Sequence, residues 1–117
     1  MEEKDRKVAG AVRDLLSSQR VGVLGTYGSG SPYCSLVGFS FEEGLGRIYF
    51  ATTRATRKYA NLAETGRVAL LVDNRTNREE DLHEASALTA IGPVRELAGP
   101  ERERAGSLHL GTHPSRR

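Results

Sequence analysis

Cysteine and aromatic residues are scarce in this sequence, and tryptophan is absent. The single cysteine, Cys34, excludes an internal disulfide framework and a metal site built from several cysteines. Aromatic residues make up 6% of the chain, which argues against a large aromatic cage around a ligand. No apolar run approaches the roughly 18 residues of a membrane-spanning helix, and the charged N-terminus does not resemble a signal peptide. We therefore expect a cytoplasmic protein.

The chain also lacks a strong excess of charge of either sign. Its formal net charge is +2, which argues against nucleic acid or an anionic membrane as the main partner. The basic residues are mostly arginine, and Lys58 is the one lysine outside the N-terminal segment. A length of 117 residues predicts a single domain, residues 1–117, with one modest hydrophobic core.

Apolar runs separated by turn signals predict several short strands between helices, and in "YCSLVGF" apolar residues at both parities imply burial on both faces. Gly66 is placed to end the second helix, and Pro93 restricts its strand to a sheet edge or a bulge because it lacks an amide donor. So many short strands in a small chain predict an α+β fold with a small antiparallel β-barrel and flanking short helices. The expected elements are helices at 4–18, 55–66 and from Pro100 onward, strands at 20–27, 32–41, 47–53, 67–73 and 85–97, and a polar loop at 74–84.

A strand-to-helix junction at residues 52–58 contains the most informative local pattern. If Thr56 is the N-cap of the helix, its hydroxyl and the free amides of the first turn form an anion-binding end. Arg57 and Lys58 follow directly, although cations are not normally favoured in a first turn. A phosphate would satisfy the amides, the hydroxyl and both cations. The alternative is a solvated helix start with ordinary surface cations.

Other chemically active residues favour structural explanations. Cys34 lies among apolar neighbours in an expected strand, which predicts a small buried hydrophobic side chain. His109 and His113 have the spacing of a metal or haem pair, but Pro114 interrupts the helix, which favours solvated histidines and no metal site. No catalytic acid, base or nucleophile can be identified from residue spacing.

The run "SLVGFSFEEGLGRIYFATTRATRKYANLAETGRVALLVDN" resembles the FMN-binding split barrels related to pyridoxamine 5′-phosphate oxidase. "TRKYANL" followed by "GRVALLV" carries most of the resemblance, which extends over residues 15 to about 97. It implies an FMN-binding flavoprotein, a flavin-dependent oxidoreductase of unassigned substrate. It also implies a homodimer with flavin at the subunit interface.

The resemblance assigns roles to particular residues. Thr56, Arg57 and Lys58 look like the group that holds the FMN phosphate, and Thr52 looks like a further phosphate or ribityl contact. The strand that contains Ser35, Leu36 and Val37 resembles the one whose backbone lies along the isoalloxazine ring.

The chain departs from the family pattern in two respects. The substrate-binding residues and C-terminal signature of the oxidase itself are not recognisable, which argues against a vitamin B6 oxidase. Many relatives continue with a further strand where this chain ends, so either barrel closure is incomplete or the chain is a fragment. Two alternatives stay open: a non-catalytic haem- or flavin-binding module, and a deazaflavin-dependent reductase on the same barrel.

Overall fold

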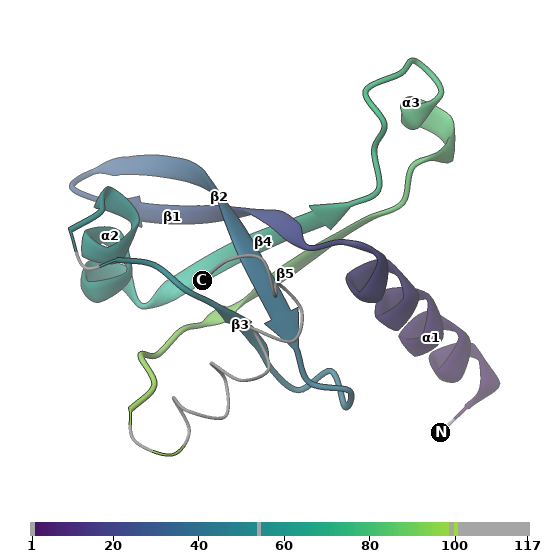
Figure 1. Cartoon of the computed structure of the whole chain (residues 1–117), viewed down its shortest axis with the longest axis horizontal. Coiled ribbons are helices and arrows are strands. Elements are labelled where there is room, and N and C mark those ends of the chain that lie inside the picture. Colours follow the sequence, from purple (N-terminus) through teal and green to yellow (C-terminus); the bar gives the residue numbers. More distant parts are fainter. Residues whose placement is uncertain (1, 54, 99, 101–117) are drawn as a thin grey trace.

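A computed structural model describes residues 2–53, 55–98 and 100. Over these residues the helices and strands follow the expected order, with one short helix added within residues 74–84 (Figure 1). The elements are α1 (Glu3–Ser18), β1 (Val21–Gly28), β2 (Ser31–Phe41), β3 (Ile48–Phe50), α2 (Arg57–Thr65), β4 (Arg67–Asp73), α3 (Asp81–Glu84) and β5 (Ala87–Pro93).

The strands form one five-stranded antiparallel sheet in the order β3-β2-β1-β4-β5. The sheet curls into a half-barrel, with α2 near the β1–β2 turn and α3 at the opposite end (Figure 1). This confirms the α+β fold with a small antiparallel barrel and flanking short helices. Pro93 ends β5, which is an edge strand as its missing amide donor requires.

The core lies on the concave side of the curled sheet, where the end of α1 covers it. Leu15 and Leu16 of α1 are buried there, as their helical spacing predicts. Leu24 and Phe39 of the sheet are fully buried beside them. The remaining buried apolar residues of this cluster are Val37, Leu70 and Val72.

The largest differences from the expected elements lie in three segments. β3 is 3 residues long, so the expected strand at 47–53 is too long and Thr52 lies in the connection to α2. The polar loop at 74–84 contains the short helix α3, and β5 is shorter than the expected strand at 85–97. For both strands, the β propensity of single residues extends beyond the part that a neighbouring strand pairs. The helix expected after Pro100 lies outside the described residues.

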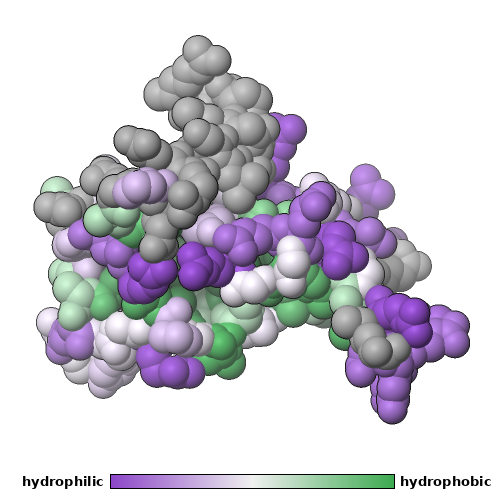
Figure 2. Space-filling view, turned by 90° about the horizontal axis from the view of Figure 1, so that it is seen from below, coloured by the Kyte–Doolittle hydropathy of each residue, from purple (hydrophilic) through white to green (hydrophobic). Residues whose placement is uncertain are grey.

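One face of the molecule combines apolar and hydrophilic residues at its surface (Figure 2). Among the described residues, several large apolar side chains are exposed, including Leu36 at 70% and Ile91 at 73%. No helix in the described part of the chain is both long and apolar enough to cross a membrane.

Candidate functional site

The first turn of α2 has the geometry that its sequence predicts. Thr56 is the N-cap, with an extended backbone, and its Oγ1 accepts a hydrogen bond from the Tyr59 amide at 3.3 Å. The same hydroxyl lies 3.0 Å from Oγ1 of Thr52 and donates to the Thr53 carbonyl at 2.8 Å. Two hydroxyl groups therefore meet at the helix N-terminus. At the other end, Gly66 closes the helix in the left-handed conformation at φ 72°, which glycine adopts without strain.

The charge at this end of α2 is positive. Arg57 is exposed and Lys58 is half-buried, and the first turn contains no acidic residue. The N-terminus of a helix adds its own partial positive charge to these two cations. The guanidinium of Arg57 lies over the ring of Tyr33, with its Cζ 5.8 Å from the ring centroid. This arrangement fits an anion with several oxygen atoms, because backbone amide, guanidinium and ammonium donors are present and the Thr52 hydroxyl lies beside them.

The three expected flavin-strand residues lie on β2, but their side chains do not share one face. Ser35 pairs with Leu24 and Val37 pairs with Gly22, so both side chains point to the inner face of the sheet, the face that carries the core. Leu36 points to the outer face and is 70% exposed. Val37 is 4% exposed, so its side chain belongs to the core and only its backbone could meet a ligand.

Among the described residues, no strand pairs with one side of the β2 backbone along most of its length. β1 pairs with residues 31–38 of β2, whereas β3 pairs only with Phe39–Phe41 among the described residues. Ser35 adds a buried hydroxyl, whose Oγ has no hydrogen-bond partner in the described part of the chain. Since buried polar groups normally have partners, this hydroxyl and the unpaired backbone groups of β2 can form hydrogen bonds to a polar ring system.

Sequence reasoning missed the residue that docks α2. The apolar side chains of α2 are half-buried or exposed, and the buried residue of the helix is Asn61, at 2% exposure. The Asn61 side chain donates to Oγ1 of Thr26 on β1 at 3.0 Å. The available signal was the spacing of Asn61, one helical turn after Arg57 and therefore on the same side of α2.

The expected burial of Cys34 is wrong for the isolated chain. Cys34 is exposed, because its position in β2 places it on the outer face of the sheet, opposite Gly25. The neighbouring outer positions, Leu36 of β2 and Ile91 of β5, are exposed apolar residues. The apolar surroundings of Cys34 in the sequence are therefore real, but no element of the described chain covers them.

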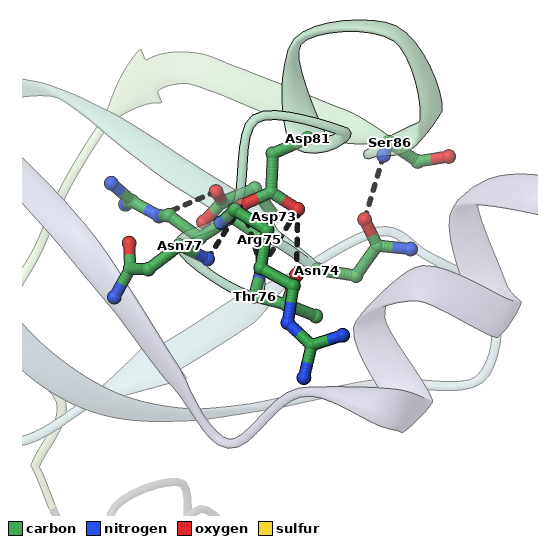
Figure 3. Close-up of polar contacts among 8 residues, drawn as sticks. Asp73, Asn74, Arg75, Thr76, Asn77, Asp81 and Ser86 are labelled. Atoms are coloured by element: carbon green, nitrogen blue, oxygen red, sulfur yellow. Dashed lines mark hydrogen bonds and ion pairs between the residues drawn. The ribbon is translucent and has the colours of Figure 1, made fainter.

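The loop between β4 and β5 is ordered by one carboxylate (Figure 3). Asp81 accepts hydrogen bonds from the amides of Thr76 at 2.8 Å, Asn77 at 2.6 Å and Arg78 at 3.2 Å. These backbone hydrogen bonds, led by that of Thr76, lower the pKa of Asp81. The loop is thus a built feature, although it lies at the end of the sheet opposite α2 (Figure 1).

The histidines do not form a site in the described residues. His83 is exposed on α3, and His109 and His113 lie outside the described residues. Within residues 2–53, 55–98 and 100, no group of three or more histidine, cysteine or acidic side chains is placed to hold a metal ion.

Comparison with known proteins identifies the family. The family model described as pyridoxamine 5′-phosphate oxidase matches residues 8–113. No curated protein matches the chain.

Solved structures match over nearly the whole chain. A haem-binding protein from Mycobacterium smegmatis superposes with a TM-score of 0.79 at 22% identity, covering 92% of this chain and 43% of that one. An FAD-binding protein from Mesorhizobium loti gives 0.70 at 20% identity, covering 92% and 77%. The haem storage protein HutZ from Vibrio cholerae gives 0.63 at 16% identity, covering 88% and 79%. These similarities show the split-barrel fold, and the chain spans less than half of the first of these proteins.

Proposed function

The chain belongs to the pyridoxamine 5′-phosphate oxidase family, and on that basis we propose that it binds FMN and acts as a flavin-dependent oxidoreductase. The observation that carries the proposal is the N-terminus of α2, where the Thr52 and Thr56 hydroxyls lie at a first turn that contains Arg57 and Lys58 but no acidic residue. A phosphate monoester matches this set of donors.

Other described residues fit the remaining parts of the cofactor. The open edge of β2 at residues 31–38 offers backbone donors and acceptors to the polar edge of an isoalloxazine ring. The buried hydroxyl of Ser35 would gain a partner there. When bound, FMN would supply the redox chemistry, and the protein would anchor the phosphate, orient the ring and limit its contact with water.

We propose a homodimer as the state that completes the site. On the outer face of the sheet, Leu36 pairs with Val23, which pairs in turn with Leu71, so one apolar row crosses three strands. The next row contains Cys34, Gly25, Ala69 and Ile91. An apolar sheet face of this extent is typical of an interface. Covering it with a second copy would bury Cys34 and Leu36.

The phosphate contact is tested by removing both cations. In the Arg57→Ala/Lys58→Ala double variant we expect FMN affinity to fall by at least about a hundredfold, since each charge-assisted hydrogen bond contributes about 1.5–3 kcal/mol. Quenching of flavin fluorescence on titration measures the dissociation constant. The matched control is Arg6→Ala/Lys7→Ala, which removes the same two residue types from α1 and should leave the affinity unchanged. Unchanged FMN affinity in the Arg57/Lys58 variant would sink the assignment.

A haem-handling module is the second candidate, supported by the haem proteins among the similar structures. Identifying the molecule that purifies with the protein separates the candidates. FMN gives a yellow protein with the mass of FMN after extraction, and a deazaflavin gives a different mass. Haem gives a Soret band, which would be lost on replacing both His109 and His113 if these residues bind the iron.

A further inference from the structure

Polar contacts connect α2 to the β1–β2 hairpin at three places along the helix. The one buried side chain of α2 is Asn61. Near the end of the helix, the Glu64 carboxylate accepts the Ser29 amide at 3.0 Å, and the Thr65 hydroxyl donates to the Tyr27 carbonyl. A surface helix normally docks through an apolar stripe, which tolerates small shifts. Hydrogen bonds instead fix both the distance and the rotation of a helix.

The contact of Asn61 continues through the sheet to Arg57. Asn61 Nδ2 donates to Thr26 Oγ1 at 3.0 Å, and Thr26 Oγ1 donates to the Tyr33 carbonyl at 3.4 Å. The ring of Tyr33 lies under the Arg57 guanidinium, which is one helical turn before Asn61. The contacts therefore form a closed circuit from α2 to β1, to β2 and back to α2.

The circuit is buried where it leaves α2 and exposed where it returns. Asn61 is 2% exposed and Thr26 is 5% exposed, whereas Tyr33 is 40% exposed. Gly28 allows the close approach, because a Cβ at this position would lie 2.3 Å from Asn61 Oδ1. A buried side-chain amide is unfavourable without a hydrogen-bond partner, so the Asn61 amide can move little relative to Thr26. Asn61 thus limits where the first turn of α2 can stand relative to Tyr33.

We infer that Asn61 is a positioning residue, which acts through Thr26 and Tyr33 to place Arg57 for the phosphate of the flavin. This inference rests on the proposed function. Asn61 does not itself reach the ligand in this role, because its amide is enclosed between α2 and β1. Its effect is on the part of the affinity that the phosphate contributes.

The test compares FMN with riboflavin, which lacks the phosphate, on the full chain. The wild type should bind FMN more tightly than riboflavin, and the ratio of the two dissociation constants reports the phosphate contact. In Asn61→Ala and in Thr26→Val we expect this ratio to fall roughly tenfold, the scale of one lost hydrogen bond. Riboflavin affinity should change little. Thr26→Ser keeps the hydroxyl and should retain the wild-type ratio.

The matched Thr26 variants keep the test decisive if Asn61→Ala does not fold, since valine has nearly the shape of threonine. Circular dichroism and thermal unfolding establish folding for each variant. A wild type without preference for FMN over riboflavin would overturn the proposed function and this inference together. A wild type with that preference and an unchanged ratio in Thr26→Val would overturn the positioning role alone. Equal loss of FMN and riboflavin binding in Thr26→Val would also overturn it, because that result indicates a general structural role.

Discussion

At the scale of the residue, a few polar side chains hold α2 on the sheet, a role that apolar side chains usually have. Asn61 and Thr26 are buried and bonded to each other, and Gly28 leaves room for the Asn61 side chain. A buried hydrogen bond contributes modestly when it is made, but it costs more when one partner is left alone. Stability and site geometry therefore depend on the same small group of residues.

Gly28→Ala tests this dependence directly. The new Cβ would lie 2.3 Å from Asn61 Oδ1 and 2.8 Å from Glu64 Oε2, so the helix or its side chains must shift. We expect the free energy of unfolding to fall by about 1–3 kcal/mol, the usual cost of overpacking, as measured by urea denaturation. Gly10→Ala is the control, because nothing lies within 4 Å of its Cβ position and alanine favours a helix. Equal stability of the Gly28→Ala protein and the wild type would contradict the close packing of α2.

At the scale of the element, each end of the sheet has its own cluster of polar groups. The N-terminus of α2 gathers hydroxyls and cations at one end, and the Asp81 carboxylate gathers backbone amides at the other. Asn77 in that loop has a positive φ of 63°, which asparagine tolerates better than most residues. Local hydrogen bonds thus give the loop between β4 and β5 a defined shape without burial.

The pH dependence of the loop follows from Asp81. Hydrogen bonds from the loop amides lower the pKa of its carboxyl, so the loop is stabilised above the ordinary pKa of aspartate. That stabilisation is lost as the pH falls through the lowered pKa of the folded state. We expect the amide NMR signals of Thr76 and Asn77 to titrate in this acidic range and to be insensitive to it in Asp81→Asn.

The loop contains its own control. The Ser86 amide donates to Asn74 Oδ1 at 2.7 Å (Figure 3), so its signal should not follow the Asp81 titration. Thr76 and Asn77 signals that stay constant through the acidic range would contradict the role of Asp81.

At the scale of the whole molecule, the two faces of the curled sheet differ. The inner face carries the core and is covered in part by α1 and α2, while the outer face presents exposed Leu36, Ile91 and Cys34. An open recess on the outer side is lined by Val21, Val23 and Leu36 together with Asp73 and Arg75. Within the described residues, no element covers this apolar outer face, which is the kind of surface that a second molecule can bury.

Leu36→Asp tests the proposed dimer. A charge in the middle of an apolar interface should shift the protein from dimer to monomer, because an unpaired buried carboxylate is strongly unfavourable. Size-exclusion chromatography with light scattering measures the mass without added flavin. Leu82→Asp is the matched control, since Leu82 is 86% exposed on α3 rather than on the sheet face. A monomeric wild type, or a Leu36→Asp protein that stays dimeric, would refute this interface.

By itself, the sequence determined the order of the elements, the family and the local shape of the α2 start. Thr56 as N-cap, Gly66 as C-cap and Pro93 at an edge follow from short-range stereochemistry, which nearby residues define. The resemblance pointed to Thr56, Arg57 and Lys58 as one group, with Thr52 as a further contact, and all four lie at the N-terminal end of α2.

Only the tertiary structure decided which side chains share a face and which are buried. Ser35 and Leu36 are neighbours in the chain, yet the alternation of β2 places them on opposite sides of the sheet. From the sequence alone, Asn61 is expected to be a polar surface residue. In the structure α2 packs on β1, which brings Thr26, 35 residues away, within hydrogen-bonding distance of Asn61. Such contacts depend on strand register and helix docking, and these arise from the packing of the whole sheet rather than from local propensity.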